Sequence, residues 1–242
     1  MMTLEEKIAG LLAALDHPEK TKIRAAVNGL IELSADAPQV RTAAELALNE
    51  GRNKNRWATA YVLGHLPKPS GAAIRALLDG LDHAEPDVRW AIALLLIRIA
   101  KSEGSLIPLL SALCREGTAS QRRMAVYCIR DLQLRDDDSM QALLSATRDT
   151  EATVRVAAVT SLKSRSDAGD AARRRLLDIF LHDDEIRVRN ASAITLAQLG
   201  SPSEEFIAAL QAAKNTSDAP LKKAVAAALL LLEIERPAST GG

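Results

Sequence analysis

A short motif that recurs about every 33 residues constrains the fold of this chain more than any other feature. Each copy places a basic residue two positions before an alanine, and successive basic residues stand 32 to 34 positions apart. The basic residues are Arg24, Arg56, Arg89, Arg123, Arg155, Arg189 and Lys222, and the alanines are Ala26, Ala58, Ala91, Ala125, Ala157, Ala191 and Ala224. Self-similarity at a fixed period of this length is typical of a repeat protein, in which each repeat packs on its neighbours.

Each repeat carries two stretches of apolar residues at helical spacing. In the third repeat Val88, Ile92 and Leu96 lie on one face of a second helix, and Ile74 and Leu78 lie on one face of a first helix. The sequence therefore predicts an all-α solenoid of about seven two-helix repeats, forming a single domain over residues 1–236 with a disordered tail at 237–242. We expect the recurring alanines to mark the points where a second helix approaches its neighbour closely.

Two helix starts can be predicted from capping sequences. Thr3 followed by Glu6 forms one capping box, and the run from Ser201 to Glu204, with Pro202 at the first helical position, forms another.

The composition agrees with a helical protein that has no large aromatic core. Hydrophobic residues make up 48% of the chain but aromatic residues only 2%, and basic and acidic residues both number 31. A dedicated nucleic-acid binder usually carries a basic excess, so zero net charge counts against that function.

The N-terminus does not have the pattern of a signal peptide, and no apolar run approaches the roughly 20 residues of a membrane span. We expect a cytoplasmic protein whose two cysteines, Cys114 and Cys128, are buried thiols.

The order of an acidic turn, then Val-Arg, then Ala resembles the HEAT repeat. The stretches from Asp82 to Arg89, from Asp149 to Arg155 and from Asp183 to Arg189 carry this resemblance, which is to the short bacterial form also found in phycobilisome bilin lyases. The resemblance covers about residues 3–235. It implies a right-handed superhelix whose second helices line the concave surface. It also implies that the recurring basic residues pair with turn acids of their own or a neighbouring repeat, for which Asp16, Asp82, Asp149 and Asp183 are the candidates.

The resemblance allows more than one function. A non-catalytic scaffold that binds a protein partner is the leading hypothesis, and a bilin-lyase-like enzyme or its accessory subunit is the alternative. A nucleic-acid binder of the HEAT-like glycosylase type is the third. We expect no metal and no cofactor, because no His-Glu pair of the iron-binding HEAT-like hydroxylases occurs. The turn histidines His17, His83 and His182 lie in repeats too far apart to share an ion.

One candidate surface stands out for partner binding. The second helices of repeats two to four contain all of the tryptophan and tyrosine residues, interleaved with arginines, and these residue types are enriched at interface hot spots. The predicted surface comprises Arg56, Trp57, Tyr61, Arg89, Trp90, Arg122, Arg123, Met124 and Tyr127. It favours an acidic, partly apolar peptide or helix. The alternative is that both tryptophans are packed between helices as core.

The last helix suggests a second contact. The run from Leu229 to Leu232 places apolar side chains almost all round a terminal helix, whose outer face is normally polar. We therefore expect self-association or a partner at this end of the chain.

Overall fold

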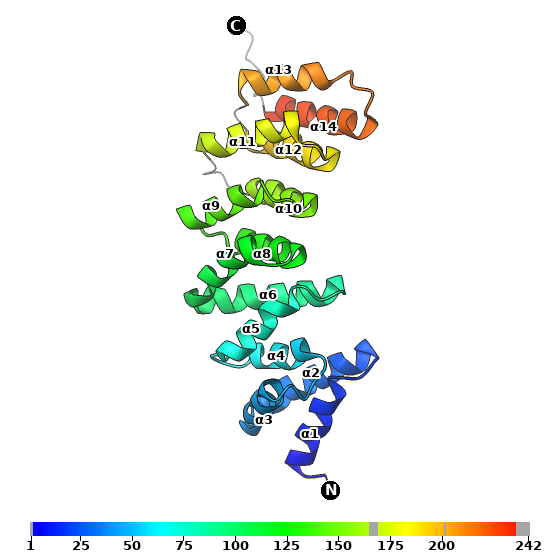
Figure 1. The fold of residues 1–242 in the computed structure, drawn as a ribbon, viewed down its shortest axis with the longest axis vertical. Helices are drawn as coiled ribbons and strands as arrows, with labels where there is room; N and C mark the ends of the chain where they lie inside the picture. The colour runs from blue at the N-terminus through cyan, green and yellow to red at the C-terminus, as the bar shows by residue number, and fades with distance from the viewer. Residues whose placement is uncertain (1, 165–168, 201, 236–242) are drawn as a thin grey trace. The chain divides into compact units, whose positions relative to one another are not determined.

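A computed structural model describes residues 2–164, 169–200 and 202–235, and every regular element in them is a helix. The helices fall into two compact units, residues 1–106 and 107–242, which we describe one at a time. Figure 1 shows the helices in chain order. The N-terminal unit contains α1 (Leu4–Ala14), α2 (Lys20–Ser34), α3 (Gln39–Asn49), α4 (Arg56–His65), α5 (Gly71–Gly80), α6 (Pro86–Ser102) and the 3-10 turn η1 (Gly104–Leu106).

The C-terminal unit continues the same alternation of a first and a second helix. It contains α7 (Ile107–Glu116), α8 (Ala119–Leu132), α9 (Asp137–Ala146), α10 (Ala152–Leu162), α11 (Gly169–His182), α12 (Ile186–Gln198), α13 (Glu204–Ala213) and α14 (Ala219–Glu235). The described helices thus make seven pairs, and the predicted all-α repeat fold is confirmed. The predicted disordered tail at 237–242 lies outside the described residues.

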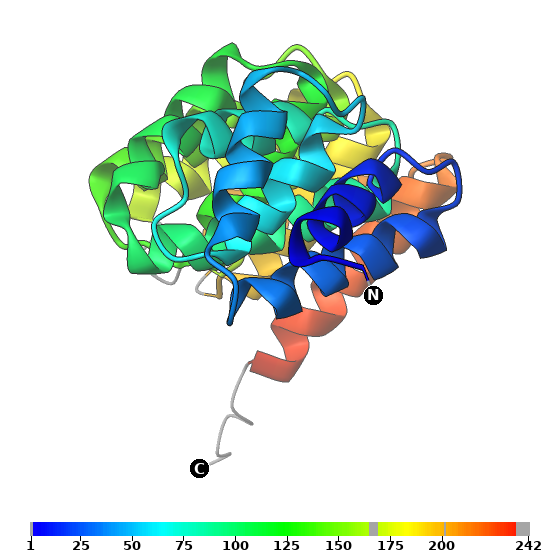
Figure 2. The same cartoon turned by 90° about the horizontal axis from the view of Figure 1, so that it is seen from below.

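Second helices pack on second helices within each unit. In the N-terminal unit α2 contacts α4 and α4 contacts α6, while α1 contacts α3 and α3 contacts α5. Figure 2 views the ribbon from below, where α1 (dark blue) packs against α2. In the C-terminal unit the second helices α8, α10, α12 and α14 contact one another in order. None of the helices within the described ranges is long and apolar enough to cross a membrane.

One capping prediction is confirmed and the other is wrong in register. The side chain of Thr3 accepts a hydrogen bond from the Glu6 N–H, and the Glu6 carboxylate accepts one from the Thr3 N–H. At the start of α13 the cap is Ser203, whose hydroxyl accepts from the Phe206 N–H. Pro202 therefore precedes the helix, and Ser201 lies outside the described residues. Either serine offers the same hydroxyl acceptor, so the local sequence alone did not separate them.

Small residues on the second helices allow this close stacking. Ala58 and Ala60 on α4 and Ala157 and Ala158 on α10 have no exposed surface. At Gly64, near the end of α4, an added Cβ would stand 2.9 Å from a Leu95 methyl and 3.0 Å from a Leu77 methyl. A methyl group at this position would force the ends of these leucine side chains to shift, so glycine favours the close approach of α5 and α6 to α4.

The alanine prediction holds for five of the seven positions and fails at two. Ala26, Ala58, Ala125, Ala157 and Ala224 are buried, whereas Ala91 and Ala191 are only half-buried. On α6 the fully buried alanine is Ala93, two residues further along. The motif locates the helix correctly, but the buried face of α6 is rotated away from Ala91, which borders a surface pocket instead.

Two buried ion pairs join adjacent repeats in the C-terminal unit. Arg155 on α10 donates to both carboxylate oxygens of Asp183, which lies in the turn between the two helices of the next repeat, at 2.9 and 2.8 Å. It also donates to Asp184. Arg122 on α8 donates to both oxygens of Asp149 at 2.6 and 2.7 Å. The predicted pairing of a repeat cation with a neighbouring turn acid is therefore found here. In the fourth repeat the pairing residue is Arg122, so the assignment of Arg123 to the series was wrong by one position.

The ion pairs also set the ionisation of their acids. Burial alone would raise the pKa of Asp183. The hydrogen bonds from the Arg155 guanidinium and the Glu185 N–H outweigh burial, and the pKa lies below its ordinary value. The pKa of Asp149 is lowered in the same way, against its burial, by Arg122 and by the Glu151 N–H. Both carboxylates are therefore charged at neutral pH, as a bidentate pair with arginine requires.

The other basic residues of the series do not pair with the expected acids. Arg89 donates to the backbone carbonyls of His83 and Ala84, and Arg189 donates to the carbonyl of Phe180. Asp16 accepts from backbone N–H groups instead of a cation, and Asp82 is exposed. The basic residue still fixes the turn, because a carbonyl oxygen accepts from a guanidinium as a carboxylate does.

Two further predictions concern the cysteines and the last helix. Cys114 and Cys128 are both buried, as predicted, and burial raises the pKa of the Cys114 thiol to about 12. On α14 Leu229, Leu231 and Leu232 pack partly against the core, and Leu230 is the exposed member of the run. The apolar end face is therefore smaller than the sequence suggests, and self-association through it stays a prediction.

Replacing Ala93 by leucine should destabilise the protein more than the same change at Ala91. Ala93 is fully buried, so the larger side chain overpacks the core and lowers the free energy of unfolding by about 1–3 kcal/mol. Ala91→Leu adds its side chain to a half-buried position beside a pocket and should change stability by about 0.5 kcal/mol or less. Urea denaturation of the two variants measures this difference, and equal effects would contradict the assigned faces of α6.

Removing the cation of a buried pair should be costly. Arg155→Met leaves the carboxylate of Asp183, whose side chain is 6% exposed, without its partner, and should lower the free energy of unfolding by about 3–5 kcal/mol. Arg187→Met on α12 is the matched control, because its ion pair with Glu185 is exposed and should contribute about 1 kcal/mol or less. Because the folded pKa of Asp183 is lowered from 3.8, the pair stabilises the fold above that pH. The contribution of the pair to the free energy of unfolding should shrink as the pH falls through the folded pKa of Asp183. The difference in stability between Arg155→Met and the wild type should shrink with it.

Candidate functional site

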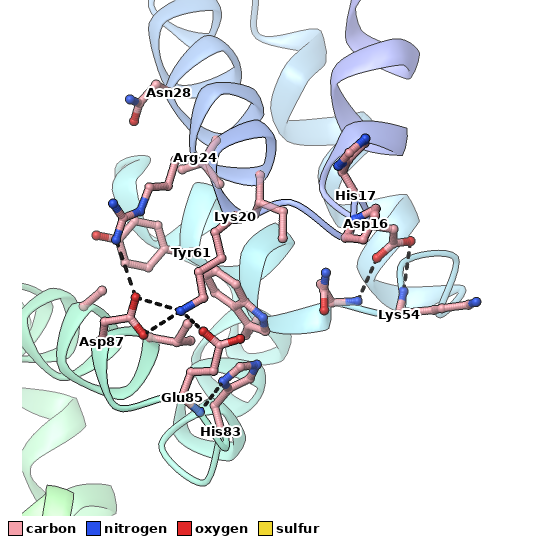
Figure 3. Close-up of a pocket in the computed structure, with 17 residues that line it drawn as sticks. Asp16, His17, Lys20, Arg24, Asn28, Lys54, Tyr61, His83, Glu85 and Asp87 are labelled. Atoms are coloured by element: carbon pink, nitrogen blue, oxygen red, sulfur yellow. Dashed lines mark hydrogen bonds and ion pairs between the residues drawn. The ribbon is translucent and has the colours of Figure 1, made fainter.

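A pocket of about 450 Å³ opens on the N-terminal unit where its three second helices begin. Lys20 opens α2, Trp57 lies in the first turn of α4, and Asp87 and Val88 lie in the first turn of α6. The turns that precede these helices and later residues of the same helices supply the rest of the lining. The pocket therefore exists because the parallel second helices bring three helix starts to one edge of the unit. Figure 3 shows the residues that line it.

Two aromatic side chains of α4 are the largest apolar groups in the lining of the pocket. Trp57 is half-buried, and its ring meets the His83 ring edge-on with centroids 5.7 Å apart. Tyr61 follows one helical turn later, with its ring centroid 4.6 Å from that of His65. Burial raises the pKa of the Tyr61 hydroxyl, although the nearby Arg98 charge opposes this, so the group is neutral and can donate or accept a hydrogen bond. Both rings contact the core of the unit and present one edge to the pocket.

Charged side chains bridge the mouth of the pocket from α2 to α6. The Lys20 ammonium lies 3.2 Å from each carboxylate oxygen of Asp87 and also contacts Glu85, and the Arg24 guanidinium lies 3.5 Å from Asp87. Figure 3 shows Lys20 and Arg24 converging on Asp87. The hydrogen bond from Lys20 lowers the pKa of Asp87. All of these side chains are at least two-fifths exposed, so the pairs are accessible to salt and to competitors.

The turns beside the pocket are held by side-chain acceptors. Nδ1 of His83 accepts from the Glu85 N–H at 3.1 Å, and Asp16 accepts from the N–H groups of Lys54 and Asn55 at 3.1 and 2.8 Å. Burial and the charge of Arg89 lower the pKa of His83, so its ring is neutral at physiological pH and Nδ1 remains an acceptor. Across the described ranges of the chain, no three His, Cys, Asp or Glu side chains are grouped as a metal site requires.

The structure places part of the predicted surface at this pocket. Trp57 and Tyr61 line it, while Trp90 sits on α6 outside the lining, with 38% of its surface exposed. Arg89 is tied to its own turn, and Arg56 is exposed and donates to the carbonyl of Leu48. The question of core or surface thus has a different answer for each tryptophan: Trp57 is half-buried, and Trp90 is the more exposed of the two.

The four predicted residues of the C-terminal unit do not form an exposed patch. Met124 is 2% exposed, so its assignment to an exposed surface was wrong. Arg122 is paired with Asp149, and its part in binding stays a prediction. Tyr127 packs partly on the core, with the guanidinium of Arg130 4.9 Å from its ring centroid, and Arg123 is half-buried. A residue beside the repeated cation can face inward or outward, because a one-residue change of register rotates it by about 100°.

Sequence reasoning missed the charged half of the pocket. Lys20 and Asp87 are 67 positions apart and belong to repeats one and three, and neither is part of the recurring motif. The signal that was available is weak, since each is simply a charged residue at the start of a second helix.

The helix pairs define the class of protein as an α-helical repeat protein, and comparison with known proteins identifies the family. A family model for HEAT repeats matches residues 108–194 and 140–230, together just over half of the chain, so the chain belongs to the HEAT repeat family. No curated protein matches it.

Several solved structures resemble the chain at low sequence identity. The Escherichia coli protein YibA is 18% identical, with 93% of this chain and 92% of that one covered and a TM-score of 0.49. Human deoxyhypusine hydroxylase in complex with glycerol is 16% identical, with 94% and 85% covered and a TM-score of 0.45. The complex of CpcE and CpcF of phycocyanin lyase from Nostoc is 18% identical, with 99% and 91% covered and a TM-score of 0.39.

The two tryptophans should differ in their access to solvent. In a Trp90→Phe variant the emission comes from Trp57 alone, and in a Trp57→Phe variant it comes from Trp90 alone. Acrylamide should quench Trp90 readily, because the side chain is exposed, and should quench Trp57 more weakly, because its ring is wedged against His83. Trp57 should also emit at shorter wavelength. Equal quenching of the two would contradict the burial described here.

Proposed function

We propose that this protein is a non-catalytic adaptor that binds a protein partner, and that the pocket on the N-terminal unit is the centre of its binding site. The observation that carries this proposal is the pairing of an aromatic floor, Trp57 and Tyr61, with a rim of exposed charges. Aromatic anchors surrounded by polar groups are what interface hot spots consist of. The HEAT repeat is a fold whose long surfaces are used for binding.

The size of the pocket fits one or two anchoring side chains of a partner. A volume of about 450 Å³ is at the small end of ligand sites, and it is open to the surface along the second helices. Beyond it, Trp90 and Leu94 stand one turn apart on α6 and are 38% and 61% exposed. A partner segment seated in the pocket can continue along this apolar strip, which gives the contact more area than the pocket alone.

The state of the polar groups supports binding over catalysis. His83 holds a turn through Nδ1, Asp16 accepts two backbone N–H groups, and Asp87 is matched with two cations. A general acid or base must be able to exchange a proton with a substrate near its working pH. These groups instead perform structural tasks in their present protonation states. Two buried cysteines suit a reducing compartment, and a cytoplasmic location is part of the proposal.

Site-specific crosslinking in the native host tests whether the pocket is the binding site. A photo-reactive phenylalanine analogue at Asn28, an exposed residue that lines the pocket, should capture a defined partner. The same analogue at Arg75, an exposed residue of α5 outside the lining, should not capture it. Trp57→Ala should reduce capture from Asn28 at least about tenfold, as loss of a hot-spot tryptophan does. A thermal melt checks that the variant is folded. Identical capture from both positions, unaffected by Trp57→Ala, would overturn the proposed site.

A further inference from the structure

We propose that the pocket selects a partner segment in which an acidic side chain stands beside an apolar anchor, and that Asp87 occupies the place of that partner carboxylate in the free protein. This inference rests on the proposed function and names the chemistry of the partner. The anchor contacts Trp57 and Tyr61, and the partner carboxylate takes over the two cations that now hold Asp87.

The starts of three helices decide the sign of the charge that the pocket attracts. The first turns of α2, α4 and α6 all border it, and none of their N-cap residues Glu19, Asn55 and Glu85 makes a side-chain cap. Unpaired N–H groups and the helix dipoles make such ends positive. Lys20 is the first residue of α2, so its charge lies at the positive end of its own helix. Lys20 therefore requires an anion, whereas Asp87 in the first turn of α6 is favoured by its helix without any cation.

The cations of the pocket are held in a way that a ligand can displace. In the C-terminal unit Arg122 and Arg155 are locked by bidentate contacts to buried acids, with side chains 17% and 10% exposed. Lys20 and Arg24 are 48% and 72% exposed, and both pair with the exposed Asp87, while Lys20 also pairs with the exposed Glu85. Exposed pairs of this kind contribute little to stability and exchange readily. An incoming carboxylate replaces one such contact by another and leaves Asp87 stabilised at its helix start.

A buried donor in the floor adds a second requirement. The indole Nε1 of Trp57 has no solvent-exposed surface and no hydrogen-bond acceptor among the described residues. A buried N–H without an acceptor is unfavourable, so a partner that displaces the side chains covering it and brings an oxygen to it gains selectivity. A peptide supplies such oxygens from its backbone carbonyls as well as from an acidic side chain.

The same features argue for a protein segment over a nucleic acid. The two exposed cations Lys20 and Arg24 each already have an acid beside them, and Asp16, Glu85 and Asp87 all lie in the lining. A nucleic acid presents a phosphate at every nucleotide, and a binder needs a run of cations to match. One carboxylate next to an apolar side chain demands no more positive charge than the pocket holds.

Peptide selection against the full chain tests the inference. A phage-displayed library of random linear peptides is selected on the wild-type protein, and enriched sequences are synthesised with a fluorescein label for anisotropy titrations. We expect enrichment of Asp or Glu next to an aromatic or branched apolar residue. The double variant Lys20→Gln with Arg24→Gln should weaken these peptides at least about tenfold. Asp87→Asn should strengthen them about threefold or more, because the internal competitor is lost. Higher salt should weaken binding to the wild type.

Matched controls separate charge at the pocket from charge elsewhere. Arg75→Gln with Asp79→Asn on α5 makes the same chemical changes on exposed residues outside the lining, and should alter affinity by less than about twofold. Asn28→Trp fills the mouth from an exposed position without touching the core, and should abolish binding even if Trp57→Ala disturbs folding.

The outcomes distinguish this inference from the proposed function. If the enriched peptides are blocked by Asn28→Trp but are basic, and Asp87→Asn weakens them, the preference for an acid is wrong while the protein-binding site stands. If a fluorescein-labelled single-stranded oligonucleotide displaces the peptides with comparable affinity, the site binds nucleic acid and the inference is overturned. If no enriched peptide is sensitive to Asn28→Trp, the inference and the proposed site both fail.

Discussion

The packing of second helices against one another is the interaction on which the rest of this structure depends. Small side chains such as Ala58, Ala60 and Gly64 on α4 let α5 and α6 approach it closely. Close approach keeps the second helices in contact in sequence order, and their first turns then lie together at one edge of the unit. The pocket is a consequence of this stacking, since the residues that line it come from three repeats and meet only when the helices are packed.

One turn position explains why the two units treat the same motif differently. His17, His83, Asp149, Asp183 and Thr216 stand six or seven residues before the repeated cation, and each accepts a hydrogen bond from the N–H two residues on. Where this residue is aspartate, in repeats five and six, it also binds the arginine of the preceding repeat and closes the junction with a buried ion pair. In repeat three it is a neutral histidine, which packs against Trp57.

The choice of histidine or aspartate therefore has a functional consequence. A carboxylate at the turn forms an ion pair with the arginine of the preceding repeat, so that this arginine is not available to bind a ligand. A neutral ring leaves the preceding arginine, Arg56, exposed, and provides an aromatic wall next to Trp57. Within the described ranges, the acids that pair with Lys20 and Arg24 of α2 come from the start of α6, and they are exposed. The same repeat thus forms a closed structural junction in one unit and an open, charged pocket in the other.

The sequence by itself determined the helical repeat, its period and the two helices of each repeat. Apolar residues at helical spacing and a recurring small residue are local signals, so they can be recognised without the tertiary structure. It also indicated that Trp57 and Tyr61 belong together, since they are one turn apart on one helix. The tertiary structure decided the rest. It showed that Met124 is core, that Arg122 and not Arg123 binds the turn acid, and that Lys20 meets Asp87 across 67 residues. Those outcomes depend on the rotation of each helix about its axis and on contacts between repeats. A periodic pattern determines the register of the motif only to within one residue, so it does not decide which side chains face inward.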